Sequence, residues 1–196
     1  MFGTNAVIGV KPADEYQFRA FCTPVGPYFK GGVKPLTICV SDFDESGVTA
    51  PTPAQLVEKL ARGKCLAVAK DHPGAVVLGC DTVVDVGGEV FGKPHSVEDA
   101  KRMLRALSGA THEVHTGVCV SDGVRTESFV DSCKVTFFPI SEGEIDAYTA
   151  TKEPYDKAGA YAIQGRAALW LDRLEGDYYT IMGLPVSRTA RLLNRF

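Results

Sequence analysis

The sequence lacks several features that would place it in a specialised class of protein. None of its six cysteines forms a CxxC pair, and no apolar run approaches the roughly 20 residues that a membrane-spanning helix needs. It also lacks an excess of positive charge, because 21 lysines and arginines stand against 24 acidic residues. We therefore expect neither a membrane nor a nucleic-acid backbone as a partner.

The N-terminus and the cysteines argue against a secreted protein. The N-terminus lacks the basic segment and long apolar region of a signal peptide. Most cysteines lie inside apolar stretches, which is typical of reduced core residues in a cytosolic protein. They are Cys22, Cys39, Cys65, Cys80, Cys119 and Cys133. Cys80 adjoins Asp81, but a cysteine nucleophile needs an adjacent base, and the sequence shows none. We expect a cytoplasmic protein without a catalytic cysteine.

The length and composition are those of a globular protein. With 196 residues, of which 45% are hydrophobic, the chain suffices for one domain with a substantial core, or for two small lobes. Predicted strands and helices alternate, with hairpins among them. This order favours an α/β fold with a mixed sheet over a purely parallel one. We predict a single domain over residues 1–196.

Hydrophobic patterns, turn signals and capping residues predict the individual elements. Predicted strands cover 5–10, 36–40, 76–84 with a return strand after residue 88, 111–120, 124–138 and 167–171. Predicted helices cover 13–21, 53–70, 97–107, a segment that starts at 141, and 186–193. Gly87-Gly88 and Asp122-Gly123 are hairpin signals. Residues 23–35, with three prolines and three glycines, are typical of a loop.

The stretch from Val76 to Pro94 combines a carboxylate with a lysine. Asp81 and Thr82 interrupt an apolar run that is typical of a strand buried on both faces. Such a carboxylate must be hydrogen-bonded, paired or bound to metal, since an isolated buried charge is too unfavourable. The predicted hairpin returns Lys93 towards the same end of the sheet. This combination suits metal-assisted phosphoryl chemistry; the alternative is a capping Asp81 and a solvated Lys93.

Lys64 is a second lysine in an unusual setting. It shares a face of the predicted helix 53–70 with Leu56, Leu60 and Ala67, so it lies on the apolar stripe. Either its aliphatic part follows the apolar surface and the ammonium reaches solvent, or the ammonium points into an anionic pocket.

Two other motifs suggest different chemistry. His112-Glu113-Val114-His115 lies in a predicted strand, where residues three apart face opposite sides, so we do not expect it to bind metal. The segment 37–44 is an apolar strand that ends in Asp42-Phe43-Asp44, which resembles the first motif of haloacid-dehalogenase-type phosphatases. However, Gly176-Asp177 lacks the second acidic residue that this superfamily needs. A phosphatase of this type is a weaker alternative.

An ordered series of short phrases resembles the Maf family of nucleoside triphosphate pyrophosphatases, over roughly residues 41–196. The phrases are Asp42-Phe43-Asp44-Glu45, Lys64-Cys65, Gly79-Cys80-Asp81-Thr82-Val83-Val84, Gly92-Lys93-Pro94, Leu107-Ser108-Gly109 with His112, Thr116-Gly117-Val118, Asp156-Lys157-Ala158-Gly159-Ala160-Tyr161, Ile163-Gln164-Gly165, Gly176-Asp177-Tyr178 and Gly183-Leu184-Pro185. Asp81-Thr82 and Ile163-Gln164-Gly165 resemble the branch that cleaves dTTP and UTP.

The resemblance implies hydrolysis of dTTP, UTP or modified pyrimidine triphosphates to the monophosphate and pyrophosphate, with Mg²⁺ or Mn²⁺. It implies Asp81 as general base or metal ligand, Lys64 and Lys93 as triphosphate ligands, and Thr82 and Gln164 as residues that select the base. The acidic phrase adds Glu45 as a candidate ligand of substrate and metal. The implied fold is a twisted central sheet with helices on both faces, a hairpin-rich second lobe and a cleft between the lobes. A homodimer is also implied.

The N-terminal part departs from the family pattern. The family has Ser-x-Ser-Pro-Arg-Arg after its first strand, whereas this chain has Gly9-Val10-Lys11-Pro12-Ala13-Asp14. Lys11 or Arg19 could replace an arginine, but a lysine offers only a point charge instead of a bidentate contact. The chain is therefore a pyrophosphatase, a weak or inactive nucleotide-binding regulator, or a protein whose functional N-terminus differs from this one.

Overall fold

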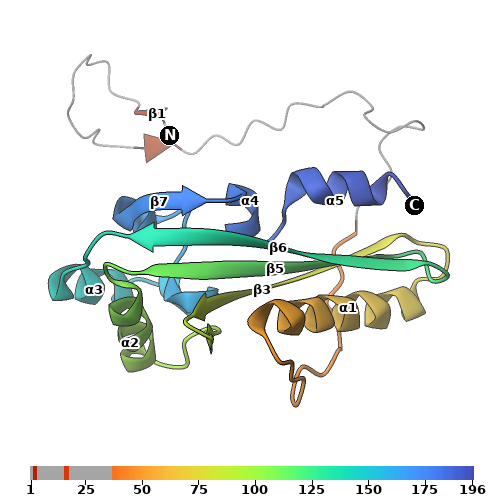
Figure 1. Cartoon of the computed structure of the whole chain (residues 1–196), viewed down its shortest axis with the longest axis horizontal. Helices are drawn as coiled ribbons and strands as arrows, with labels where there is room; N and C mark the ends of the chain where they lie inside the picture. Colours follow the sequence, from red (N-terminus) through yellow and green to blue (C-terminus); the bar gives the residue numbers. More distant parts are fainter. Residues whose placement is uncertain (1, 4–15, 18–36) are drawn as a thin grey trace. The chain divides into compact units, whose positions relative to one another are not determined.

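The computed structural model describes residues 2–3, 16–17 and 37–196 (Figure 1). The chain divides into two compact units, Met1–Ile38 and Cys39–Phe196. In the first, β1 (Phe2–Gly3) pairs antiparallel with β2 (Tyr16–Gln17). The strand expected at 5–10, the helix at 13–21, the loop at 23–35 and the candidate Lys11 lie outside the described residues. The single domain over 1–196 stays a prediction.

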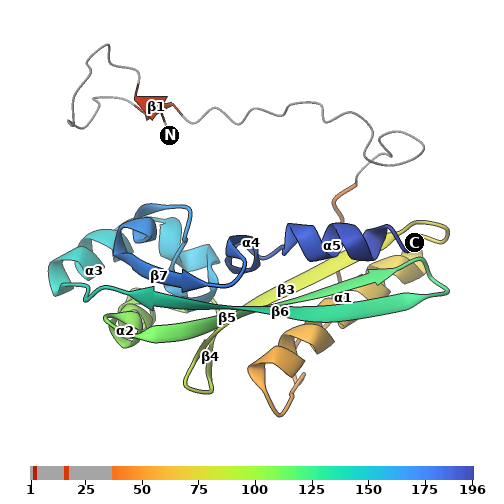
Figure 2. The same ribbon diagram turned by 45° about the horizontal axis from the view of Figure 1, so that its top comes forward.

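A five-stranded sheet forms the centre of the second unit, in the order β4-β3-β5-β6-β7 (Figures 1 and 2). Its strands are β3 (Val77–Val86), β4 (Glu89–Phe91), β5 (Thr111–Ser121), β6 (Thr126–Phe137) and β7 (Leu171–Glu175). Gly87 and Gly88, at φ 63° and 94°, form the first predicted hairpin turn. The α/β class is confirmed, but all pairs between the described strands are antiparallel, so the sheet of this part of the chain is antiparallel and not mixed.

The three helices whose capping residues the sequence shows, after Thr52, Ser96 and Ser141, begin where those residues predict, whereas the short helix at 178–181 was not predicted. The α-helices are α1 (Pro53–Asp71), α2 (Val97–Leu107), α3 (Glu142–Thr149), α4 (Tyr178–Ile181) and α5 (Val186–Leu193). Thr52 and Ser96 each accept a hydrogen bond from the backbone three residues later, and Ser141 with Glu144 forms a capping box. No described helix is long and apolar enough to cross a bilayer.

Helices cover both faces of the sheet (Figure 1). Neighbouring residues of a strand point to opposite faces. On β5, Gly117 faces α1, where an added Cβ would meet the backbone of Val57. The preceding residue, Thr116, donates a hydrogen bond to the carbonyl of Thr180 in α4. The expectation of helices on both faces is therefore confirmed.

The larger apolar core lies on the α4 side of the sheet. Strand residues such as Val84, Val114 and Val135 pack there against α2, α3 and residues 158–170. A smaller cluster, Ala61, Cys65 and Cys119, lies on the other side beneath α1.

Two predicted strands are wrong. Residues 37–40 have no regular secondary structure, and Ile38 and Val40 are 91% and 98% exposed, so this apolar run does not enter the core. The segment expected to be a strand at 167–171 is a 3₁₀ helix, Arg166–Trp170, before β7. Its buried residues, Ala167 and Trp170, are three apart, which is the period of a 3₁₀ turn and not of a strand.

Candidate active site

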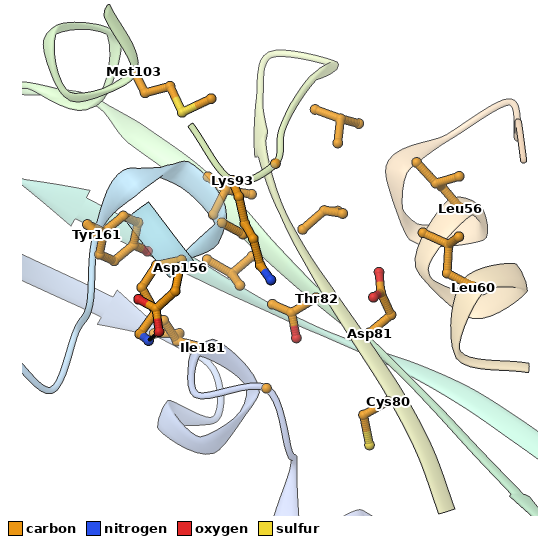
Figure 3. A pocket seen from close by; sticks show the side chains of 18 of the residues that line it. Leu56, Leu60, Cys80, Asp81, Thr82, Lys93, Met103, Asp156, Tyr161 and Ile181 are labelled. Atoms are coloured by element: carbon orange, nitrogen blue, oxygen red, sulfur yellow. Dashed lines mark hydrogen bonds and ion pairs between the residues drawn. The ribbon is translucent and has the colours of Figure 1, made fainter. Parts of the chain in front are cut away.

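The second unit contains a cavity of about 820 Å³, which α1, β3, the residues after β4, α2, the 156–158 segment and α4 enclose (Figure 3). This volume lies in the range of small-molecule sites.

The cavity follows an unpaired edge of β3. On that edge β4 pairs only with Val84–Val86, and no described strand pairs with Val77–Val83 there. Five consecutive residues, Cys80 to Val84, line the cavity. Since consecutive strand residues face opposite sides, the cavity reaches both faces of the sheet around this edge. The short β4 is thus what gives a ligand access to both sides of β3.

Lys64 from α1 and Asp81 from β3 form an ion pair inside the cavity. Lys64 Nζ donates to Asp81 Oδ1 at 2.6 Å and lies 3.0 Å from Glu45 Oε1. The side chains of Lys64 and Asp81 are 24% and 15% exposed, whereas Glu45 is 51% exposed. Lys64 therefore points from the apolar stripe of α1 towards two carboxylates.

A glycine permits this approach of α1 to the sheet. A Cβ at Gly79 would lie 2.7 Å from the Ala61 carbonyl oxygen and 2.8 Å from the Cys65 Cβ, closer than atoms tolerate. Lys64 adjoins Cys65 in the helix, and Asp81 follows Gly79 by two residues on the same strand face. The close contact of backbones therefore sets the Lys64–Asp81 distance.

Burial and charge act against each other at this ion pair. Burial raises the pKa of the Asp81 carboxyl above its ordinary value, while the hydrogen bond and charge of Lys64 oppose that rise. Burial acts to lower the pKa of Lys64, but Asp81 and Glu45 outweigh it, so the pKa of Lys64 is raised. Lys64 thus keeps its charge, and Asp81 accepts a proton more readily than an exposed aspartate.

Lys93 enters the cavity from the segment after β4. Its side chain points towards Asp81 and Thr82 (Figure 3), and its charge acts to lower the pKa of Asp81. The N–H of Gly159 donates to the Gly92 carbonyl at 3.0 Å, which holds the backbone beside Lys93. Gly159 has φ 68°, and a Cβ there would lie 2.8 Å from Val84 Cγ2, so only glycine fits. Lys93 forms no ion pair with any described residue.

Thr82 lines the cavity, whereas Gln164 lies beside it. Thr82 lines the cavity on the face opposite to Asp81. Gln164 is exposed and does not line the cavity itself, but its Nε2 donates to Met182 Sδ at 3.4 Å, and Met182 is a lining residue. The structure thus brings Asp81, Lys64, Lys93, Thr82 and Glu45 into one cavity and places Gln164 one side chain away.

The cavity is also lined by charged residues that the sequence patterns did not single out as ligands. Lys157 pairs with Asp156 at 2.6 Å, and Arg102 on α2 pairs with Asp99 and Glu89. The small residues after Lys157 permit a tight backbone approach, which is the hydrogen bond from the Gly159 N–H to the Gly92 carbonyl. The sequence could have indicated Lys157 as a cavity residue, because it directly precedes this segment of small residues. It gives no such indication for Arg102, whose pattern is that of a solvent-exposed helix residue.

The carboxylates suit a divalent cation that is shared with substrate. Asp81 and Glu45 both contact Lys64 Nζ, so they face one point of the cavity. Carboxylate oxygens are hard ligands, and Mg²⁺ is usually bound by one or two carboxylates together with phosphate oxygens and water. Within the described residues there is no group of three His, Cys, Asp or Glu side chains that could hold an ion unaided. The donor set therefore fits a cation held jointly with a triphosphate.

The residues of the alternative motifs do not form a second catalytic or metal site in the described part of the chain. His112 Nε2 is hydrogen-bonded to the Tyr161 hydroxyl, whereas His115 Nδ1 is bonded to Ser132, on the other face of the sheet. Asp42 is exposed and residues 37–41 directly before it form no strand, so these residues do not supply the buried strand that the phosphatase alternative requires. Burial raises the pKa of the Cys80 thiol to about 11, which keeps it protonated at neutral pH.

Comparison with known proteins decides the family. The family model described as Maf-like protein matches residues 29–196. The chain belongs to the Maf family. Two relatives named dTTP/UTP pyrophosphatase, from Bacillus cytotoxicus and Bacillus velezensis, are 44% and 46% identical to it over 162 residues. These matches cover 83% of this chain and 85% and 86% of the relatives. The resemblance seen in the sequence is confirmed, and every cavity residue of this Maf protein lies in the matched range.

Proposed function

We propose that this Maf protein hydrolyses dTTP and UTP to the nucleoside monophosphate and pyrophosphate, with Mg²⁺ or Mn²⁺ as cofactor. The observation that carries the proposal is the Lys64–Asp81 ion pair at the unpaired edge of β3, in a cavity that Lys93 also enters. The names of the two relatives support the choice of nucleotides.

The two lysines bind the triphosphate. Cleavage between the α- and β-phosphates increases negative charge on the phosphate oxygens, and ammonium groups that are already in place stabilise that charge. Lys64 remains protonated because its pKa is raised. Lys93 has no carboxylate partner among the described residues, so its charge is available for the substrate.

Asp81 takes a proton from the attacking water. Lys64 holds the carboxylate by Oδ1, and no hydrogen bond among the described residues uses Oδ2. The raised pKa suits a general base, whose efficiency increases as its pKa approaches the working pH. A bound divalent cation, held by Asp81 and Glu45, would neutralise charge on the phosphate oxygens.

The test is an incubation of the purified protein with a panel of nucleoside triphosphates and Mn²⁺ or Mg²⁺. The proposal predicts the monophosphate and pyrophosphate in equal amounts, with dTTP and UTP as the best substrates. Release of inorganic phosphate with the diphosphate would instead favour a phosphatase.

The second candidate is a Maf-like nucleotide-binding regulator with weak or no turnover. It is motivated by the missing serines and arginines between Gly9 and Asp14. Calorimetry that detects triphosphate binding without product would support it. If the N-terminus is the defect, arginines at Ala13 and Asp14 raise turnover; unchanged turnover would count against that explanation.

We also propose a cytoplasmic homodimer that binds neither membranes nor nucleic acid. Five cysteines in the described part of the chain are free, which suits a reducing compartment. The net charge of -3 gives no support for phosphate-backbone binding. The dimer rests on the family resemblance, and light scattering of the purified protein tests it.

A further inference from the structure

Three threonines form a chain of contacts from the cavity into the core. Thr82 Oγ1 lies 2.8 Å from Thr116 Oγ1, and Thr116 Oγ1 lies 2.7 Å from the Thr180 carbonyl oxygen. Thr82 and Thr116 are directly opposite each other on β3 and β5, and Thr180 is in α4. Thr116 and Thr180 are 0% exposed, so water does not replace these contacts.

The direction of both hydrogen bonds follows from the Thr180 carbonyl, which is the last group in this series of contacts. A carbonyl oxygen only accepts, so the single hydroxyl hydrogen of Thr116 is donated to Thr180. Thr116 Oγ1 then only accepts from Thr82, so the hydrogen of the Thr82 hydroxyl is also committed. The Thr180 carbonyl accepts a second hydrogen bond from Gly183 N at 3.1 Å, which occupies both of its lone pairs. Thr82 therefore presents only lone pairs to the cavity.

The side of Thr82 that faces the cavity is open. A Cβ at Gly183 would lie 3.2 Å from Thr82 Oγ1, and Gly183 has φ 95°. Because position 183 lacks a side chain, a planar ring can approach the Thr82 oxygen. Gly183 and Met182 line the cavity next to Thr82, and Gln164 contacts Met182.

We propose that Thr116 is a positioning residue that makes the Thr82 hydroxyl an obligatory acceptor, so that this end of the cavity selects a nucleobase with a ring N–H donor. This inference rests on the proposed nucleotide hydrolysis and adds a selection rule to it. Uracil and thymine carry an N3–H between two carbonyl groups, whereas N3 of cytosine is an acceptor. Two acceptors that face each other form no hydrogen bond and leave both groups unpaired, which disfavours cytosine.

The test compares Thr116→Val, which removes the hydroxyl at nearly constant shape, with Thr116→Ser, which keeps it. Equilibrium titrations with UMP and CMP measure base selectivity without any cleavage, and kcat/KM for UTP and CTP measures it during turnover. In Thr116→Val the Thr82 hydroxyl is free to donate to cytosine. We expect the preference for UMP over CMP to fall about tenfold in this variant and to stay near the wild-type value in Thr116→Ser.

Thr189→Val is the matched control. Thr189 is 3% exposed and its Oγ1 has no hydrogen-bond partner among the described residues, so this variant makes the same change in a buried position outside the cavity. It should keep the wild-type selectivity.

The outcomes separate this inference from the proposed function. A folded Thr116→Val with wild-type selectivity overturns the inference, as does a wild-type protein that binds UMP no better than CMP. Equal loss of selectivity in Thr116→Val and Thr116→Ser also overturns it, because packing and not the hydroxyl would then be responsible. Selective binding that depends on Thr116, without hydrolysis of any triphosphate, would support the inference and overturn the proposed function alone.

Discussion

At the scale of single residues, Asp81 and Lys64 set the expected pH dependence of turnover. Asp81 must be deprotonated to accept a proton, so kcat/KM with UTP is retained above its pKa and lost as the pH falls through it. Burial raises that pKa from 3.8, so the acid limb should lie above this value. The pKa of Lys64 is raised from 10.5, so Lys64 should cause no loss of turnover below this pH. A pH–rate profile locates the acid limb and shows whether an alkaline limb appears.

Lys64→Met sharpens this test. It removes the interactions that oppose the rise of the Asp81 pKa, so the acid limb should move to higher pH while kcat/KM falls. Lys59→Met is the control on the same helix, because Lys59 Nζ is exposed and, among the described residues, donates only to the Thr49 carbonyl. An acid limb that does not move in Lys64→Met would show that Asp81 is not the group that titrates.

His112 predicts a pH dependence of stability. It is 2% exposed, and burial lowers its pKa from 6.5 to about 4. The unfolded chain therefore binds a proton that the folded protein does not bind between these values, and stability falls as the pH decreases through this window, by on the order of 3 kcal/mol. Urea unfolding at several pH values measures the slope. His112→Phe should reduce it, and an unchanged slope would assign the effect to other groups.

At the scale of elements, the contact of α1 with β3 determines whether Lys64 reaches Asp81. Gly79→Ala should push the helix away, destabilise the protein by about 1–3 kcal/mol and lower kcat/KM. Gly143→Ala in α3 is the matched control, since no neighbouring atom of the described part of the chain lies within 4 Å of its added Cβ. It should stabilise the protein by up to about 1 kcal/mol, because alanine favours a helix. Wild-type turnover in a folded Gly79→Ala would contradict this role of the contact.

The same scale shows which elements a sequence can predict. The helices at Thr52, Ser96 and Ser141 were predicted because a cap is a local hydrogen bond, and the β3–β4 turn because Gly87-Gly88 fits positive φ. The apolar residues 36–40 were predicted to form a strand, but nothing in a short apolar run shows whether the sheet offers it a partner. Residues 167–171 were predicted as a strand because alternation and a three-residue period cannot be distinguished over five residues.

At the scale of the whole molecule, the site is assembled from segments far apart in the chain. The sequence indicated Asp81, Lys64 and Lys93 separately, and the family phrases joined them. It did not show that Thr82 faces the opposite side of β3 within the same cavity, because that depends on β4 ending at Phe91. Nor did it show Gln164 against Met182, a contact between segments that only the fold brings together.

The response to metal removal also depends on the whole molecule. Because Asp81 and Glu45 would share the cation with the triphosphate, we expect excess EDTA to abolish turnover and to leave the thermal unfolding midpoint unchanged. Differential scanning calorimetry and the turnover assay, with and without added Mn²⁺, check both statements. Turnover that persists in EDTA would contradict the proposed cofactor, and a lower midpoint would indicate a structural ion.

The most direct test of Asp81 as the reaction centre is the hydrolysis of UTP by wild type, Asp81→Asn and Asp42→Asn, with products identified by ³¹P NMR. Asp42 is exposed, so its variant controls for the loss of one carboxylate. We predict UMP and pyrophosphate from wild type and Asp42→Asn, and a loss of at least about 100-fold in Asp81→Asn with UMP binding retained. Wild-type turnover in Asp81→Asn, or inorganic phosphate as the product, would contradict the account.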